Sequence, residues 1–149
     1  MNKFTAITTE IDARGVVHLT LNRPDKKNAL SAQMIAELTE FARSIAKEPA
    51  ARVVVLRGAG DVFCAGGDLD WMKVQINADR AGRMAEARKL AQMLQSLNEL
   101  PLPLIGVVQG GAFGGGVGMA CVCDVVIAET DTKFGLTETR LGLIPATIS

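Results

Sequence analysis

The sequence carries no excess of either charge, because its 16 basic side chains balance its 16 acidic ones. Without a net field the chain has no general attraction for nucleic acid or an anionic membrane, so any charged ligand must be recognised locally. Apolar runs long enough to span a bilayer are also missing, as is a signal peptide. We therefore expect neither a nucleic-acid partner nor a membrane partner.

Cysteine and histidine are scarce. The three cysteines, Cys64, Cys121 and Cys123, lie in apolar surroundings and form no Cys-x-x-Cys pair. An odd number of such residues predicts buried, reduced thiols and a cytoplasmic location. The single histidine, His18, lies in an expected strand without a nucleophile placed to partner it. These features disfavour a catalytic histidine, and we predict no metal site.

Apolar patterning predicts one α/β domain over residues 1–149, with a hairpin followed by β-α-β units. Strands are expected at 5–11, 16–21, 52–57, 103–108 and 124–128, the last of them buried. Helices are expected at 31–47 and 77–100. In the second helix the residues expected to face the core are Met84, Ala87, Leu90, Ala91, Leu94 and Leu97.

Two glycine-rich loops, at 58–69 and 109–118, each follow an expected strand. Neither nucleotide motif fits the second loop. The last glycine of a dinucleotide fingerprint is replaced by Met119 or Cys121, depending on the register. The lysine that a phosphate-binding loop requires is also missing after Gly115.

A different role fits both loops. Loops at the carboxyl ends of neighbouring parallel strands meet at one edge of a sheet, so the N–H groups of Gly67 and Gly115 could converge on one oxygen. Such a pair forms an oxyanion hole for a carbonyl that gains negative charge. The residues alone leave open a second interpretation, in which both loops are tight turns that need glycine for packing.

Two further features also have two interpretations. The polar loop 22–28 contains Arg23, Lys26 and Lys27, and its composition favours a solvated turn over a phosphate contact. The single tryptophan, Trp71, either lines an apolar pocket or belongs to the core.

Five segments, in this order, resemble the crotonase, or enoyl-CoA hydratase/isomerase, superfamily. They are Leu21-Asn-Arg-Pro with Asn28-Ala-Leu30, Phe63-Cys-Ala-Gly-Gly-Asp-Leu69, Gly110 to Gly118, Cys123-Asp124, and Phe134 to Pro145. The end of the chain, Leu143 to Ser149, together with Asp68 to Met72, is most similar to the bacterial methylglutaconyl-CoA or isohexenylglutaconyl-CoA hydratase branch.

The resemblance implies a crotonase-like spiral of β-β-α units whose C-terminal part is apparently missing from this chain. Family members continue through further strands and helices that cover the site and build a homotrimer or a hexamer. The resemblance also implies an acyl-CoA substrate and no separate cofactor, since coenzyme A is part of the substrate. The metabolic setting would be fatty acid or branched-chain amino acid degradation.

Residue roles follow from the same resemblance. The N–H groups of Gly67 and Gly115 would hold the thioester oxygen, and Glu138 would handle the proton at the α-carbon. Asp124 would be structural. For the basic loop 22–28, the resemblance favours a contact with the phosphates of coenzyme A over a solvated turn. The residues implied to contact acyl-CoA are Arg23, Lys26, Lys27, Ala29, Ala65, Gly67, Asp68, Leu69, Trp71, Gly114, Gly115 and Gly118.

One departure from the family pattern concerns the mechanism. The first of the hydratases' two glutamates falls at Gly118, which leaves Glu138 as the one acid–base at the expected positions. A single glutamate suits a double-bond isomerase, whereas the branch resemblance favours hydration. We expect an enoyl-CoA hydratase; the alternatives are an enoyl-CoA isomerase, a thioester hydrolase and a non-catalytic acyl-CoA-binding fragment.

Overall fold

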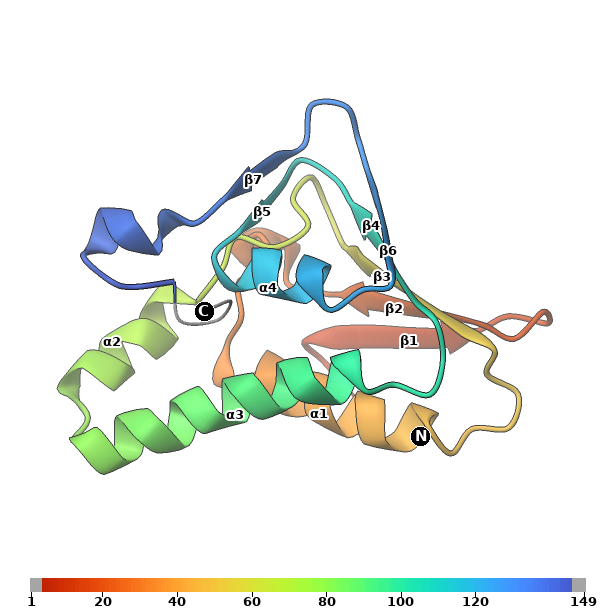
Figure 1. Cartoon of the computed structure of the whole chain (residues 1–149), viewed down its shortest axis with the longest axis horizontal. Coiled ribbons are helices and arrows are strands. Elements are labelled where there is room, and N and C mark those ends of the chain that lie inside the picture. The colour runs from red at the N-terminus through yellow and green to blue at the C-terminus, as the bar shows by residue number, and fades with distance from the viewer. Residues whose placement is uncertain (1–3, 146–149) are drawn as a thin grey trace.

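The computed structural model describes residues 4–145 and is built on a five-stranded sheet with the order β1-β2-β3-β4-β6 (Figure 1). β1 (Ile7–Ile11) and β2 (Val16–Leu21) form the expected antiparallel hairpin. The parallel strands β3 (Val53–Gly58), β4 (Leu104–Val108) and β6 (Val125–Ala128) continue the sheet from β2. The predicted α/β class and the parallel β3–β4 neighbours are confirmed.

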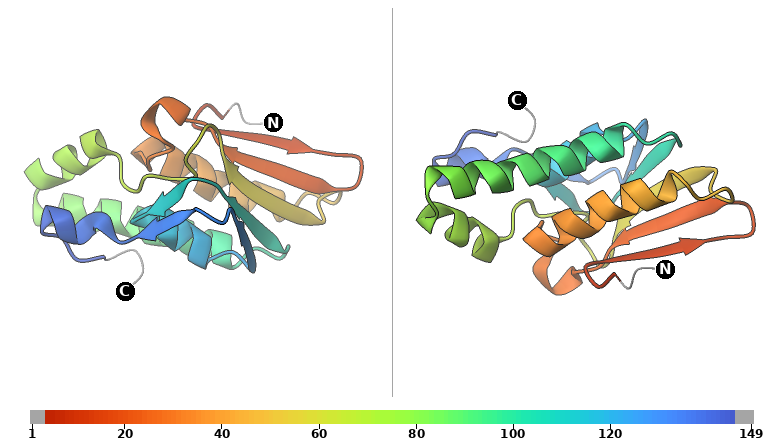
Figure 2. Two further views of the ribbon diagram at one scale, coloured as in Figure 1. Left: turned by 90° about the horizontal axis from the view of Figure 1, so that it is seen from above. Right: turned by 90° about the horizontal axis from the view of Figure 1, so that it is seen from below.

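Helices α1 (Ala32–Ile45) and α3 (Arg80–Asn98) pack side by side on one face of this sheet (Figure 2). α1 begins where expected, because the Ser31 hydroxyl accepts a hydrogen bond from the Met34 N–H. Its buried residues recur at helical spacing and face the sheet: Met34, Ile35, Leu38, Phe41, Ala42 and Ile45. Within residues 4–145 no helix is long and apolar enough to cross a membrane.

A second, two-stranded sheet forms where the chain turns at the carboxyl ends of β4 and β6 (Figure 1). It pairs β5 (Gly111–Phe113) with β7 (Lys133–Gly135) in parallel. The backbone of Cys64 bridges to Ala112 in β5, which attaches the loop after β3 to this small sheet. Helix α4 (Gly115–Cys121) starts directly after β5.

The helix predicted at 77–100 is wrong in its first part. α2 (Leu69–Asn77) ends at Asn77, and α3 starts after Asp79, whose carboxylate caps it by accepting the Gly82 N–H. α2 and the start of α3 extend beyond the carboxyl ends of β2 and β3 (Figure 1). Three residues assigned to the core are therefore exposed: Met84 (49%), Ala87 and Ala91.

Two burial predictions near the end of the chain are also wrong. β6 lies at the edge of the sheet, and its apolar side chains are exposed, with Val125 at 53% and Ile127 at 59%. Cys121 is exposed as well. Cys64 is buried as predicted, and this burial raises the pKa of its thiol to about 12.

The Glu37 carboxylate of α1 binds the backbone of residues 5–7, at the start of β1. Glu37 accepts hydrogen bonds from the N–H groups of Thr5, Ala6 and Ile7 at 3.2, 2.9 and 3.1 Å. Glu37→Gln keeps one acceptor oxygen but loses the charge, so we expect the free energy of unfolding to fall by about 1 kcal/mol in urea titrations. Glu10→Gln, at an exposed position on β1, is the control and should be neutral. Equal effects of the two changes would contradict this role.

Candidate active site

The structure brings Gly67 and Gly115 to one pocket of about 360 Å³. Leu30 lies between the two loops: its N–H donates to Gly66 O at 2.7 Å, and its carbonyl accepts the Asp68 N–H at 2.9 Å. Neither the Gly67 N–H nor the Gly115 N–H donates to a backbone or side-chain acceptor within the described part of the chain. Two unpaired backbone donors from different loops therefore line the same cavity.

Close packing explains the glycines at this point. A Cβ on Gly115 would lie 2.7 Å from Leu30 Cδ1, closer than carbon atoms can pack. Gly66 has φ +98°, and a Cβ there would lie 3.0 Å from Phe113 O. The packing interpretation and the donor interpretation of the glycine loops are thus compatible, because the close approach of the loops brings both glycines to the wall of one pocket.

Glu138 also lines this pocket, and the small β5–β7 sheet positions it there. It lies in a 3₁₀ helix (Thr137–Leu141) just after β7, while Gly114 follows β5, and the Gly114 N–H donates to Gly135 O at 2.9 Å. The carboxylate lies against Gly114, where an added Cβ would be 2.9 Å from Oε1. Glu138 Oε2 is buried and has no hydrogen-bond partner among residues 4–145. This oxygen is free to accept a proton or a hydrogen bond from a ligand.

The remaining wall of the pocket is mostly apolar and comes largely from α2 and α3. Trp71 contributes its ring, so its pocket interpretation is the one the structure supports. The indole Nε1–H donates to Glu86 Oε2 at 3.1 Å, and Lys89 Nζ lies 2.5 Å from Glu86 Oε1. These hydrogen bonds, from Lys89 and then Trp71, hold the pKa of Glu86 below its usual range. Gln75, Arg83 and Glu86 were missed from the sequence, since the helix break that turns them toward the pocket was not predicted.

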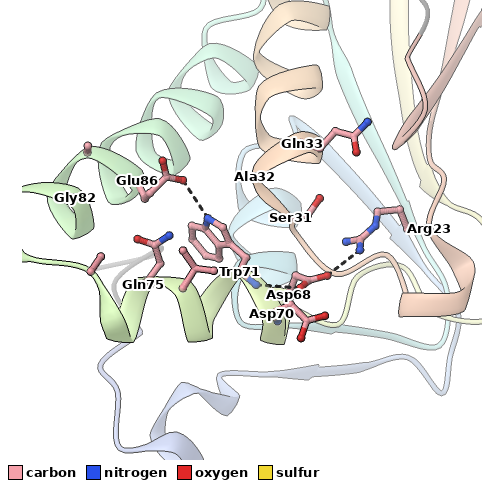
Figure 3. A pocket seen from close by; sticks show the side chains of 13 residues that line it. Arg23, Ser31, Ala32, Gln33, Asp68, Asp70, Trp71, Gln75, Gly82 and Glu86 are labelled. Carbon is pink, nitrogen blue, oxygen red and sulfur yellow. Dashed lines mark hydrogen bonds and ion pairs between the residues drawn. The ribbon is translucent and has the colours of Figure 1, made fainter.

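Arg23 and Asp68 form an ion pair at 2.8 Å beside a second, wider groove of about 730 Å³ (Figure 3). Arg23 also donates to Ala29 O at 2.7 Å, and Asp68 caps α2 by accepting the N–H groups of Asp70 and Trp71. Burial opposes ionisation of Asp68, but the Arg23 guanidinium and the two N–H donors outweigh it and lower its pKa. Both side chains hold the loop that carries Gly67.

The other predicted substrate contacts are spread over the surface near this ion pair. Lys26 Nζ lies 4.0 Å from Asp70, while Lys27 and Leu69 are exposed. The Ala65 N–H donates to Lys27 O at 2.9 Å, which joins the basic loop to the glycine loop.

Two further residues singled out in the sequence, Gly118 and Asp124, lie away from the pocket lining. Gly118 is buried in α4 and is not among the described residues that line the pocket. Asp124 accepts the Leu104 N–H and donates its own N–H to Leu104 O, at 2.7 and 2.8 Å, which fits the expected structural role.

Comparisons with known proteins identify the family of this chain. The family described as enoyl-CoA hydratase/isomerase matches residues 12–149. An enoyl-CoA isomerase/hydratase of Mycosarcoma maydis is 35% identical over 140 residues, covering 88% of this chain and 50% of the relative. The mitochondrial methylglutaconyl-CoA hydratase of Mus musculus is 32% identical over 137 residues, covering 91% of this chain and 43% of the relative.

Comparison with solved structures also finds enoyl-CoA hydratases. The crystal structure of an enoyl-CoA hydratase from Shewanella pealeana matches with a TM-score of 0.94 at 36% identity, covering 99% of this chain and 55% of that one. The chain spans about half the length of the curated relatives it matches. The family match and the fold match both extend over nearly the whole chain, and the chain therefore belongs to the enoyl-CoA hydratase/isomerase family and has the crotonase fold.

Proposed function

We propose that the protein acts as an enoyl-CoA hydratase, adding water across the α,β double bond of an acyl-CoA thioester. One observation carries the proposal: Gly67 and Gly115, whose N–H groups are unpaired within the described residues, line the same apolar pocket as Glu138, whose Oε2 has no partner there. Donors for a developing oxyanion and a free acid–base group are the two requirements of this reaction.

In the proposed mechanism the thioester oxygen accepts hydrogen bonds from the Gly67 and Gly115 N–H groups. Addition of water at the β-carbon moves the double-bond electrons through the α-carbon onto this oxygen, which gives an enolate. The backbone donors are fixed before the reaction, so they stabilise the enolate more than the neutral thioester; each donor is worth about 2.7–4 kcal/mol.

Glu138 transfers the proton in this mechanism. Its carboxylate takes a proton from water as the water oxygen bonds to the β-carbon, and then delivers that proton to the α-carbon as the enolate collapses. The product gains one hydroxyl and one hydrogen, and Glu138 returns to its starting form. The apolar side chains of the pocket wall lower the local polarity, which strengthens the hydrogen bonds to the oxyanion.

We place the coenzyme A arm along the loop 22–30 and the segment Ala65 to Leu69. Lys26 and Lys27 are exposed cations that can meet phosphate groups. Arg23 contributes by holding Asp68 rather than by direct contact with phosphate, since its guanidinium already pairs with that carboxylate.

An enoyl-CoA isomerase is the second candidate, and a specific observation favours it. Gly118 supplies no carboxylate, and Glu86 in the pocket wall is engaged by Trp71 and Lys89, so Glu138 is the one free carboxylate among the described residues of the pocket. One carboxylate is sufficient to move a proton between two carbons of a 3-enoyl thioester.

A direct assay separates these functions. The whole protein is incubated with crotonyl-CoA, with methylglutaconyl-CoA and with a 3-enoyl-CoA, while conjugated-thioester absorbance and free thiol are followed together. Hydration is expected to remove the absorbance without releasing thiol. A gain of absorbance from the 3-enoyl thioester alone would identify an isomerase, and release of thiol would identify a hydrolase. Either of these results would overturn the hydratase proposal.

A further inference from the structure

Two polar side chains on the α2–α3 part of the pocket wall, Arg83 and Gln75, have unpaired polar atoms within residues 4–145. Arg83, on α3, is exposed and makes no ion pair or side-chain hydrogen bond within residues 4–145, although it lines the pocket. Gln75, on α2, lines both this pocket and the wider groove, and its Oε1 is buried without a hydrogen-bond partner among those residues. The rest of this wall is apolar apart from Glu86. The Arg83 cation and the Gln75 amide are therefore the polar groups on it that are available to a ligand.

Arg83 does not pair with Glu86, the other charged side chain of this wall, because the Glu86 carboxylate is engaged elsewhere. Glu86 lies one turn further along α3, where an arginine–glutamate pair would normally form. Its two oxygens are instead taken by Trp71 Nε1 at 3.1 Å and by Lys89 Nζ at 2.5 Å. Figure 3 shows the Glu86 carboxylate turned toward the Trp71 ring. The guanidinium of Arg83 therefore keeps its donors for a ligand.

Gln75 adds a second, independent group. Its amide lies on the side of α2 that faces α3 (Figure 3). A buried polar atom without a partner is unfavourable, and rotation of the amide exchanges its oxygen and nitrogen, so the same position can present N–H donors. Arg83 and Gln75 can thus both donate to an anionic oxygen in the pocket.

We propose that Arg83 and Gln75 form a subsite for a second carboxylate, so that the pocket accepts the half-thioester of a dicarboxylic acid. The inference rests on the proposed function, in which the thioester end lies at Gly67 and Gly115. A wholly apolar acyl chain would cover Gln75 and crowd Arg83 without pairing either group. A terminal carboxylate pairs with both, and Lys89 already neutralises the nearby Glu86.

The test measures binding, so that it does not depend on turnover. Glutaryl-CoA is compared by calorimetry with 5-methylhexanoyl-CoA, in which an isopropyl group replaces the carboxylate; neither thioester has a double bond to hydrate. The whole protein is expected to bind glutaryl-CoA about tenfold more tightly, which is the effect of one charge-assisted hydrogen bond. Arg83→Met should remove this preference by weakening glutaryl-CoA alone. Gln75→Met should lower it partly.

Arg88→Met is the matched control, because Arg88 is exposed on the same helix and does not line the pocket. It should leave both affinities unchanged. Equal affinity of the whole protein for the two thioesters, or an equal loss for both in Arg83→Met, overturns the carboxylate subsite while crotonyl-CoA hydration still supports the enzyme. Failure to bind either thioester overturns both the subsite and the proposed function.

Discussion

Glu138→Gln is expected to lower kcat for enoyl-CoA hydration by about 10²–10⁴-fold, with little change in KM. Glutamine has nearly the same shape, so it can occupy the space against Gly114 and keep the pocket wall intact. It cannot take a proton from water at neutral pH. The loss should therefore fall on the chemical step, and steady-state kinetics with crotonyl-CoA would measure it.

Glu86→Gln is the matched control, because it removes a carboxylate from the same pocket that is not proposed to transfer a proton. Both carboxylates line the same pocket, but the Glu86 oxygens are held by Trp71 and Lys89, whereas Glu138 Oε2 has no partner among the described residues. We expect less than about tenfold loss of kcat in Glu86→Gln, since it removes no free base. A larger loss in Glu86→Gln than in Glu138→Gln would reverse the assignment of the proton-transfer residue.

The meeting of Gly67 and Gly115 was predictable from the sequence for a topological reason. Each loop follows a strand of a βαβ pattern, and β3 and β4 pair in parallel as predicted. Parallel pairing places the following loops at one edge of the sheet whatever the details of the side chains. The residues that carry the proposed oxyanion hole could therefore be named before their distances were known.

The path that brings Glu138 to these glycines could not be predicted in the same way. It depends on the pairing of β5 with β7, and each of these strands has only three residues. A three-residue strand is too short for hydrophobic alternation to be recognised, and its pairing is set by contacts distant in sequence. The motif that resembled the family identified Glu138, but the residues alone gave no position for it.

Apolar spacing also predicted the wrong core residues along α3. Such spacing shows which face of a helix is apolar, but not whether that face packs on the sheet or lines a pocket. Ala87 and Leu90 continue the stripe that begins in the core with Leu94 and Leu97. They lie where the helix passes the edge of the sheet, and they line the pocket. A helical stripe predicted to be core is thus divided into a core half and a pocket half. The start of α3 after Ala78 and Asp79 had only a capping aspartate as its signal in the sequence.

Asn28→Ala is expected to lower the free energy of unfolding by about 3–5 kcal/mol. Asn28 is completely buried, and its amide makes three hydrogen bonds. Nδ2 donates to Ala59 O and Val62 O, both at 2.8 Å, and Oδ1 accepts the Arg23 N–H at 2.9 Å. Alanine would leave these three part-buried backbone groups without their Asn28 partner. Urea unfolding followed by circular dichroism would measure the loss.

Backbone strain must be separated from the lost hydrogen bonds, because Asn28 has a φ of +54°. Lys27 provides the control, since its φ is +49° and its side chain is exposed. Lys27→Ala places alanine in the same left-handed region without removing a buried bond, so it should be nearly neutral. Asn28→Gly relieves the strain but still removes the bonds, so it should remain destabilised by at least about 2 kcal/mol.

Two of the three bonds, to Ala59 O and Val62 O, join the basic loop to the loop after β3, which continues to Gly67. The third closes the basic loop on itself through Arg23. Loss of Asn28 should therefore displace the Gly67 N–H as well as destabilise the fold. An Asn28→Gly variant that stays folded is expected to show a lower kcat for hydration than the unsubstituted protein under the same conditions. Unchanged kcat in that folded variant would mean that Leu30, which bonds to Gly66 and Asp68, is sufficient to position the donor.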